Sequence, residues 1–290
     1  MADPLPWCHL GGAWLPLREA RISPLDRGFL YADAVYEVVP VYRGRPFRFA
    51  EHLARLERSL AAIGIPNPHD AAGWRALCGE LIERNSGGEQ YFYLQVSRGA
   101  EYGRNHAPPA GLAPTVFAFC APLPAADPAQ LERGIACVTA EDIRWARCDI
   151  KSVSLLANVL LRGEAVRAGA AETILLRAGQ LTEASSSAVH VVLGDVLVAP
   201  PETHAILAGT TRAVVEELAD AAGLRRQTRP VSEAELRGAD EIWLSAAVRG
   251  LAAVTSLDGR PVGSGATGPW FRRLHRDFRA LADRLAGTPW

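Results

Sequence analysis

The spacing of hydrophobic residues changes along the chain between two periods, and each period predicts one kind of element. Short runs rich in β-branched and aromatic residues are typical of strands. We expect strands at 35–42, 91–98, 115–120, 172–176, 189–193 and 196–199. Apolar residues three or four positions apart are typical of amphipathic helices. We expect helices at 51–63, 212–222 and 269–285, and another that contains Trp74, Leu77 and Leu81.

Local signals at the ends of these segments support the same elements. Asp70 is suited to cap the N-terminus of the helix around Trp74, and Ser232 with Glu235 has the spacing of a capping box. Gly194 and Asp195 separate two apolar runs, which predicts a hairpin turn. Strands and helices interleave without internal repeats, so the sequence predicts a mixed α/β fold.

A proline-rich stretch divides the chain. Residues 121–130 contain three prolines between the strand at 115–120 and the apolar segments that follow. A chain of 290 residues suits two modest domains better than one. We therefore expect an N-terminal α/β domain at 1–120, a linker at 121–130 and a C-terminal α/β domain at 131–290 that carries the lysine discussed below.

Composition excludes several classes of protein. The net charge of −1 argues against a nucleic-acid partner. The five cysteines are odd in number and lack the spacing of a disulfide framework or a zinc site, so we expect no metal and a reducing cytoplasm. The N-terminus lacks the features of a signal peptide, and no window approaches the roughly 18 apolar residues that a membrane span needs. We expect a cytoplasmic protein without a membrane partner.

The chain contains a single lysine. Lysine and arginine together number 31, and Lys151 is the only lysine among them. Arginine serves any ion pair or solvated surface, whereas only lysine readily loses its proton to become an amine nucleophile. An arginine-rich composition alone would also allow the lysine to be an accident. Its surroundings favour a chemical role, because Lys151 directly precedes an apolar run at 155–160, where we expect a strand or turn to deliver the amine at the start of a helix.

Two further segments carry groups that suit a cofactor. Glu183 precedes three serines at 185–187, and residues 207–211 open a helix whose N–H groups and hydroxyls suit a phosphate. Taken alone, Glu183 is an ordinary solvated turn residue and 207–211 an ordinary threonine-capped helix. Together, an amine, a carboxylate and a phosphate cradle are what pyridoxal phosphate requires.

With these residues in place, the chain resembles the fold-type IV pyridoxal-phosphate enzymes. This group includes branched-chain aminotransferases, D-amino acid aminotransferases and aminodeoxychorismate lyases. The resemblance extends from Asp26 to about Gly259. It implies a two-domain α/β fold with mixed α+β character, a cofactor cleft between the domains, and a homodimer.

The resemblance also implies a role for individual residues. Lys151 falls on the family's Schiff-base lysine and Glu183 on the partner of the pyridine nitrogen. Arg55 matches the arginine that binds the cofactor phosphate, although its helix position alone would make it a solvated charge. Leu207 falls where the family packs an apolar side chain against the ring. The phosphate-binding loop falls on Gly209, Thr210 and Thr211.

The N-terminal half resembles D-amino acid aminotransferases in particular. Residues 26–39 match a stretch of those enzymes. The resemblance also implies that Arg104 and His106, together with Tyr36, hold the substrate α-carboxylate. Arginine offers a carboxylate a planar pair of donors, and histidine and tyrosine add single donors. Without the resemblance, 98–106 would be an ordinary surface loop. The resemblance implies transamination between D-amino acids (D-alanine, D-glutamate) and 2-oxo acids (2-oxoglutarate, pyruvate), with this loop reaching the neighbouring subunit's site.

The chain departs from the family pattern in two places. Residues 245–250 carry alanines, Val248 and Arg249 where D-amino acid aminotransferases carry several hydroxyl residues. Arg249 is open to two interpretations, a second carboxylate contact or a surface charge. Ser154 replaces an asparagine expected soon after the lysine.

Other functions share parts of this pattern. A branched-chain L-aminotransferase and an (R)-selective amine aminotransferase would use the same cofactor, but neither calls for the Arg104 and His106 anchor. An aminodeoxychorismate lyase would keep the lysine and release pyruvate without an amino acceptor. From a different class, a cofactor-free carbonyl-binding protein or an inactive regulatory homologue would also fit the composition.

Overall fold

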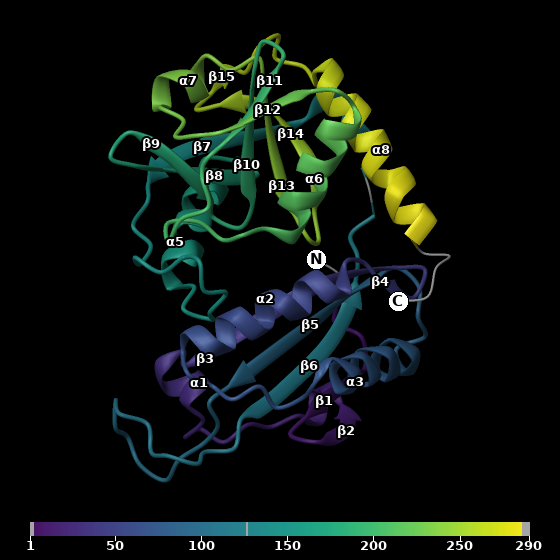
Figure 1. Ribbon diagram of the computed structural model, residues 1–290, viewed down its shortest axis with the longest axis vertical. Coiled ribbons are helices and arrows are strands. Elements are labelled where there is room, and N and C mark those ends of the chain that lie inside the picture. Colours follow the sequence, from purple (N-terminus) through teal and green to yellow (C-terminus); the bar gives the residue numbers. More distant parts are fainter. Residues whose placement is uncertain (1–2, 126, 286–290) are drawn as a thin grey trace. The chain divides into compact units, whose positions relative to one another are not determined.

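The computed structural model describes residues 3–125 and 127–285, which belong to two compact units (Figure 1). The first unit contains residues 3–124, the short segment Ile150–Ser154, and residues 283–285. The second contains Ala125–Asp149 and Leu155–Ala282. The boundary after Pro124 lies within the expected linker.

The first unit is built on an antiparallel sheet. Among the described residues this sheet has six strands in the order β2-β1-β6-β5-β3-β4. The strands are β1 (Trp7–Leu10), β2 (Ala13–Pro16), β3 (Ala34–Tyr42), β4 (Arg45–Pro46), β5 (Gln90–Ser97) and β6 (Thr115–Pro122). The helical segments are η1 (Leu17–Glu19), α1 (Arg27–Tyr31), α2 (Phe49–Ala62) and α3 (Ala71–Arg84). The buried side chains of α2 and α3 form one apolar core with alternate residues of β3, β5 and β6, because side chains of a strand point alternately to its two faces.

The second unit is built on a mixed sheet. In the described part of the chain it has nine strands, in the order β12-β11-β10-β13-β14-β7-β8-β9 with β15 beside β14. The strands are β7 (Ile135–Glu141), β8 (Glu172–Arg177), β9 (Gln180–Ala184), β10 (Ala188–Leu193), β11 (Val196–Ala199), β12 (Arg225–Thr228), β13 (Glu241–Ala246), β14 (Gly250–Leu257) and β15 (Arg260–Pro261). The helices are α4 (Pro128–Arg133), α5 (Leu156–Arg167), α6 (Thr210–Ala221), α7 (Glu233–Arg237) and α8 (Pro269–Leu285). Helices α6 and α8 contribute to one apolar core with Val192 and Trp243, and α7 contributes to a second.

The structure confirms the elements that hydrophobic spacing predicted. All six expected strands and all four expected helices are present. Asp70 caps α3 by accepting a hydrogen bond from the Gly73 N–H at 2.7 Å, and Ser232 and Glu235 form the capping box. Strand β9 was not predicted, because the alternation of its side chains is interrupted by buried polar residues.

The lysine segment belongs to a different unit from the one expected. Ser152 pairs with Val35 of β3, and the Val153 N–H donates to the Ala34 carbonyl at 3.1 Å. Ile150 contributes to the apolar core of the first unit. Backbone pairing and burial therefore place Ile150–Ser154 with the first unit, although the flanking sequence on both sides belongs to the second.

Helix α5 follows the lysine segment, as expected, and buries Leu161 and Ala165, but several of its other apolar residues are exposed. The exposed fractions of Leu156, Val159 and Leu160 are 73%, 64% and 54%. Three of the apolar positions that indicated this helix therefore face solvent in the isolated chain. None of the helices in the described ranges is both long and apolar enough to cross a membrane.

Candidate active site

Lys151 lies beside Tyr36 in the first unit. The Tyr36 N–H donates to the Lys151 carbonyl at 3.0 Å, and the Lys151 N–H donates to the Ser59 hydroxyl at 3.2 Å. Residues opposite each other in an antiparallel pair direct their side chains to the same face. Accordingly, the half-buried Lys151 Nζ lies 4.3 Å from the centre of the Tyr36 ring. The chain's only side-chain amine is thus held against an aromatic face.

Arg55 is part of a buried ionic cluster. It donates from Nε to Glu37 Oε1 at 2.7 Å and from Nη2 to Oε2 at 2.8 Å. His52 Nδ1 lies 2.7 Å from Glu37 Oε2, since His52 and Arg55 are three residues apart on the same face of α2. The prediction that Arg55 would be a solvated charge on the helix pattern alone does not hold, because only 5% of the residue is exposed.

Burial disfavours the charged forms of Glu37 and His52 in this cluster. Burial by itself would raise the pKa of Glu37, but the Arg55 charge and hydrogen bonds, together with the hydrogen bond to His52, hold it well below its usual range. Burial also lowers the pKa of His52 despite the nearby Glu37 carboxylate. We therefore assign His52 as neutral, with its Nδ1–H donating to Glu37.

Glu183 lies on β9 in the second unit, where it is buried. Arg144 donates from Nη1 to Glu183 Oε1, and the Leu207 N–H donates to Oε2 at 3.3 Å. Arg144 is oriented in turn by Asp142, through Nε to Oδ1 and Nη2 to Oδ2, both at 2.8 Å. Burial would raise the pKa of Asp142, but the hydrogen bonds and charge of Arg144 lower it. The Glu183 carboxylate is consequently held at both oxygens.

The segment from Leu207 to Gly209 leads into α6, which begins at Thr210. Gly209 is the N-cap residue, with φ −79° and ψ 123°, and it has no side chain with which to cap the helix. A Cβ added to Gly209 would lie 3.1 Å from Arg212 Cβ, tighter than ordinary contact. Thr211 is buried and Thr210 half-buried. The start of a 12-residue helix, with its N–H groups and positive dipole end, is a favourable position for a phosphate.

The serines after Glu183 surround another carboxylate. Glu172 is fully buried and accepts hydrogen bonds from the hydroxyls of all three serines. Its donors are Ser185, Ser186 at 2.7 Å and Ser187 at 3.3 Å. Arg249 Nη2 donates to the same group at 3.3 Å. Neither earlier interpretation of Arg249 describes this arrangement, in which the guanidinium pairs with an internal carboxylate.

The three residues expected to bind the substrate carboxylate are not brought together within one chain. Tyr36 contacts Lys151 and stacks with Tyr93, with ring centres 5.7 Å apart. Arg104 and His106 are exposed and instead meet Tyr31, at 5.3 Å from Arg104 Cζ and 5.5 Å from the His106 ring to the Tyr31 ring centre. The Arg104 and His106 pair therefore forms a group separate from the lysine.

Sequence reasoning missed the partners of the cofactor residues. Arg144, Glu37 and Glu172 each hold a predicted residue or segment in place, yet they lie far from it in the sequence. Helical spacing between His52 and Arg55 was a usable signal for their shared partner. The Asp142 and Arg144 pair, shortly before Lys151, had no comparable signal because its target on β9 lies 39 residues away.

These residues fit pyridoxal phosphate. Lys151 carries the chain's one side-chain amine, Glu183 carries a carboxylate that is held at both oxygens, and α6 begins at a glycine that has no side chain. Such an amine, hydrogen-bond acceptor and anion site are the groups by which proteins hold this cofactor. The fold and these groups are those of a fold-type IV pyridoxal-phosphate enzyme.

Comparisons with known proteins specify the family. The amino-transferase class IV family pattern matches residues 34–257. The chain is 40% identical over 258 residues to a D-alanine aminotransferase of Bacillus licheniformis, covering 89% of this chain and 90% of that protein. It is 36% identical over 271 residues to a D-alanine aminotransferase of Listeria innocua, covering 93% of each. The chain belongs to the class IV aminotransferases.

Solved structures agree with this assignment. A branched-chain amino acid aminotransferase of Escherichia coli matches with a TM-score of 0.87 and 26% identity, covering 96% of this chain and 94% of that one. A T.th. branched-chain amino acid aminotransferase, solved with pyridoxamine 5'-phosphate, matches with a TM-score of 0.89 and 25% identity over the same shares. The predicted family, the mixed α/β fold of type IV and the pyridoxal 5'-phosphate cofactor are confirmed.

Proposed function

We propose that this enzyme transfers amino groups between D-amino acids and 2-oxo acids, with D-alanine or D-glutamate as donors and 2-oxoglutarate or pyruvate as acceptors. The observation that carries this proposal is the similarity to D-alanine aminotransferases over about nine-tenths of both chains. The branched-chain enzymes are similar in structure but less so in sequence.

Several residues of this chain would hold the cofactor. They are Lys151, Arg55, Glu183, Leu207, Gly209, Thr210 and Thr211. Glu183 would accept the hydrogen bond of the pyridine nitrogen, with its orientation fixed by Arg144 and the Leu207 N–H. Bound pyridoxal phosphate supplies an aldehyde carbon for the amine and a ring that accepts electrons.

Lys151 has two roles in this scheme. Its Nζ would be the nucleophile toward the aldehyde carbon of bound pyridoxal phosphate, and as a free amine it would take the proton from the substrate Cα and hold it for return. The Tyr36 ring lies against this amine and limits the positions that Nζ can adopt. Lys151 is a suitable proton carrier because its backbone is fixed by Tyr36 and Ser59 while its side chain is only half-buried.

Arg104, His106 and Tyr36 would bind the substrate α-carboxylate, with the loop supplied by the second subunit of a homodimer. The separation of Arg104 and His106 from Tyr36, and their exposure, support a loop that acts in trans. Binding by a two-pronged arginine and a histidine would orient the substrate so that its Cα–H bond is accessible to Lys151.

Mixed dimers test this sharing directly. We expect the Lys151→Ala and Arg104→Ala variants each to have low transaminase activity when expressed alone. Co-expression of the two should recover about a quarter of wild-type activity, because about half of the dimers are then hybrids and each hybrid has one intact site out of two. Activity no higher than the average of the two separate variants would show that each chain uses its own loop. A mixture of Lys151→Ala with wild type serves as the control for dilution of active chains.

A spectroscopic experiment tests the reaction. We expect the visible absorption of the enzyme with pyridoxal phosphate to be lost on addition of D-alanine and restored by 2-oxoglutarate, with no response to L-alanine. A response to L-alanine alone would favour a branched-chain-type L-aminotransferase, and a response to carboxylate-free (R)-amines alone would favour an amine aminotransferase. Pyruvate release without any amino acceptor would identify a lyase.

We also propose that the protein is located in the cytoplasm. All five cysteines are buried and free, a state that a reducing cytoplasm maintains. Fractionation of the producing cell, with aminotransferase activity followed in each fraction, tests the cytoplasmic location.

A further inference from the structure

Asp26 fastens both ends of the loop that carries Arg104 and His106. Ser97, at the end of β5, donates its hydroxyl to Asp26 Oδ2 at 3.0 Å, and Thr115, at the start of β6, donates to the same oxygen at 2.7 Å. The other oxygen accepts from the Gly28 N–H at 2.8 Å and so caps α1. The buried Asp26 carboxylate thus links the start of α1 by hydrogen bonds to the end of β5 and the start of β6, which flank the loop.

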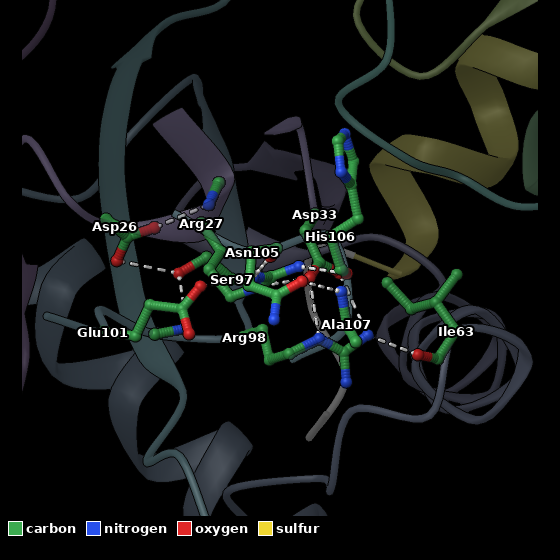
Figure 2. A network of polar contacts seen from close by, with 12 residues as sticks. Asp26, Arg27, Asp33, Ile63, Ser97, Arg98, Glu101, Asn105, His106 and Ala107 are labelled. Carbon is green, nitrogen blue, oxygen red and sulfur yellow. Dashed lines mark hydrogen bonds and ion pairs between the residues drawn. The ribbon is translucent and has the colours of Figure 1, made fainter. Parts of the chain in front are cut away.

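Arg27 follows Asp26 and holds the loop itself (Figure 2). Only 3% of this residue is exposed. From Nη1 it donates to Glu101 Oε1 at 2.5 Å and to the Asn105 carbonyl at 2.7 Å, and from Nη2 to the His106 carbonyl at 3.0 Å. The Arg27 guanidinium therefore links Glu101, near the start of the loop, to the backbone at 105 and 106.

Asp33 fixes the direction of the Arg27 guanidinium. It accepts from Arg27 Nε at 2.9 Å and from Arg98 Nε and Nη2 at 2.7 and 3.0 Å. Arg98 also donates to the carbonyls of Ile63 and Gly64 beyond the end of α2. Because the Arg27 guanidinium is planar and its Nε is paired with Asp33, its Nη1 and Nη2 donors are directed to the loop.

Tyr31 contacts the side chains that the loop presents. Its ring centre lies 4.6 Å from Arg27 Cζ, 5.3 Å from Arg104 Cζ and 5.5 Å from the His106 ring centre. The Tyr31 hydroxyl is buried and makes no hydrogen bond to any described residue. The ring, rather than the hydroxyl, is therefore the part of Tyr31 that the loop uses.

We propose that Arg27 and Tyr31 are positioning residues for the substrate-carboxylate anchor formed by Arg104 and His106. Arg27 fixes the backbone at 105 and 106, and the Tyr31 ring restricts the side chains on either side of Asn105. An exposed loop without these contacts would lose conformational freedom each time it bound a carboxylate, whereas a loop ordered in advance does not. This inference rests on the proposed function, since it assigns a purpose to the anchor.

Arg27→Lys is the first test, because lysine keeps the charge but not the planar set of donors. In the holoenzyme we expect amide hydrogen exchange across 101–107 to become about tenfold faster. We expect KM for D-alanine to rise about tenfold while kcat changes by less than about threefold, as for a loss of substrate binding. Wild-type exchange in the variant would overturn the proposal, and so would a mobile loop with wild-type KM.

Tyr31 provides a second test that does not depend on how Arg27→Lys folds. Tyr31→Phe retains the ring, so we expect wild-type exchange and KM. Tyr31→Leu removes the aromatic face, so we expect faster exchange at 101–107 and a KM increase of about threefold or more. Equal exchange rates and equal KM values for Tyr31→Phe and Tyr31→Leu would show that the aromatic ring does not order the loop.

Arg21→Lys is the matched control. Arg21 also donates to backbone carbonyls, those of Arg18 and Ala20 at 2.8 Å, but it is exposed and lies on a different segment. We expect this variant to keep wild-type exchange at 101–107 and wild-type KM. Failure of the proposed function would be seen separately, as wild-type enzyme inactive with D-alanine, and the exchange comparison would still decide whether Arg27 and Tyr31 order the loop.

Discussion

Arg249 donates from Nη2 to Glu172 Oε2 across 3.3 Å, and this pair connects the turn between β13 and β14 to the first residue of β8. Glu172 is fully buried, whereas a quarter of the Arg249 side chain is exposed. Because the same carboxylate accepts from the three serines that follow Glu183, Arg249 supports the segment that leads away from the cofactor-binding carboxylate.

Replacing Arg249 should affect stability rather than substrate choice. We expect Arg249→Ala to lower the free energy of unfolding by about 1.5 to 3 kcal/mol, the usual contribution of a hydrogen bond to a charged group. Urea unfolding of the holoenzyme measures this loss. The ratio of KM values for D-glutamate and D-alanine should stay unchanged. A selective increase for D-glutamate would instead mean that Arg249 binds a second substrate carboxylate.

The single lysine makes a simple prediction about activity. We expect Lys151→Ala and Lys151→Arg both to abolish transamination, because no other side-chain amine exists to replace it and a guanidinium does not act as the nucleophile at neutral pH. Product formation measured with D-alanine and 2-oxoglutarate decides the matter. Substantial turnover in either variant would contradict the role given to Lys151.

Arg144 should matter to catalysis although it was not evident from the sequence. We expect Arg144→Met to reduce kcat about tenfold or more, since it removes a charge-assisted hydrogen bond of about 1.5 to 3 kcal/mol from Glu183. Steady-state kinetics with saturating cofactor measures the effect. Exposed Arg226→Met, which breaks surface ion pairs with Asp220 and Glu216, is the comparison variant. Similar kcat values for both variants would argue against a role for Arg144 in orienting Glu183.

The buried Glu37 should make stability depend on acid pH. Its pKa in the folded protein lies well below the ordinary value of 4.5, because Arg55 and His52 outweigh burial. The contribution of the Glu37 carboxylate to the free energy of unfolding is therefore complete at pH values above its pKa in the unfolded protein. It is lost as pH falls below about 4.5 toward the pKa in the folded protein. In urea titrations, Glu37→Gln should show a shallower loss of unfolding free energy than wild type between about pH 5 and about pH 3. Parallel pH profiles would show that Glu37 does not carry this dependence.

Sequence patterns predicted the local features of this molecule better than its long-range contacts. The strand at β3 and the helix α2 follow from residue spacing, since each buries one face against the same core. The rarity of lysine indicated Lys151 before any fold was considered. The position of Lys151 in the first unit could not be predicted, because it depends on a backbone pairing with Val35 and Ala34, far earlier in the chain. The partners of Glu183 and Arg55 depend on similar contacts, which leave no periodic signal.

The isolation of Lys151 among arginines has a consequence for chemical labelling. An amine-directed reagent finds one side chain on this protein, and that amine lies against the Tyr36 ring beside the proposed substrate site. Apart from the N-terminus, every molecule of label that the chain acquires therefore reports on the reacting position. Reductive trapping of the bound cofactor would mark a single arginine-flanked peptide, and its yield would count working sites in a preparation.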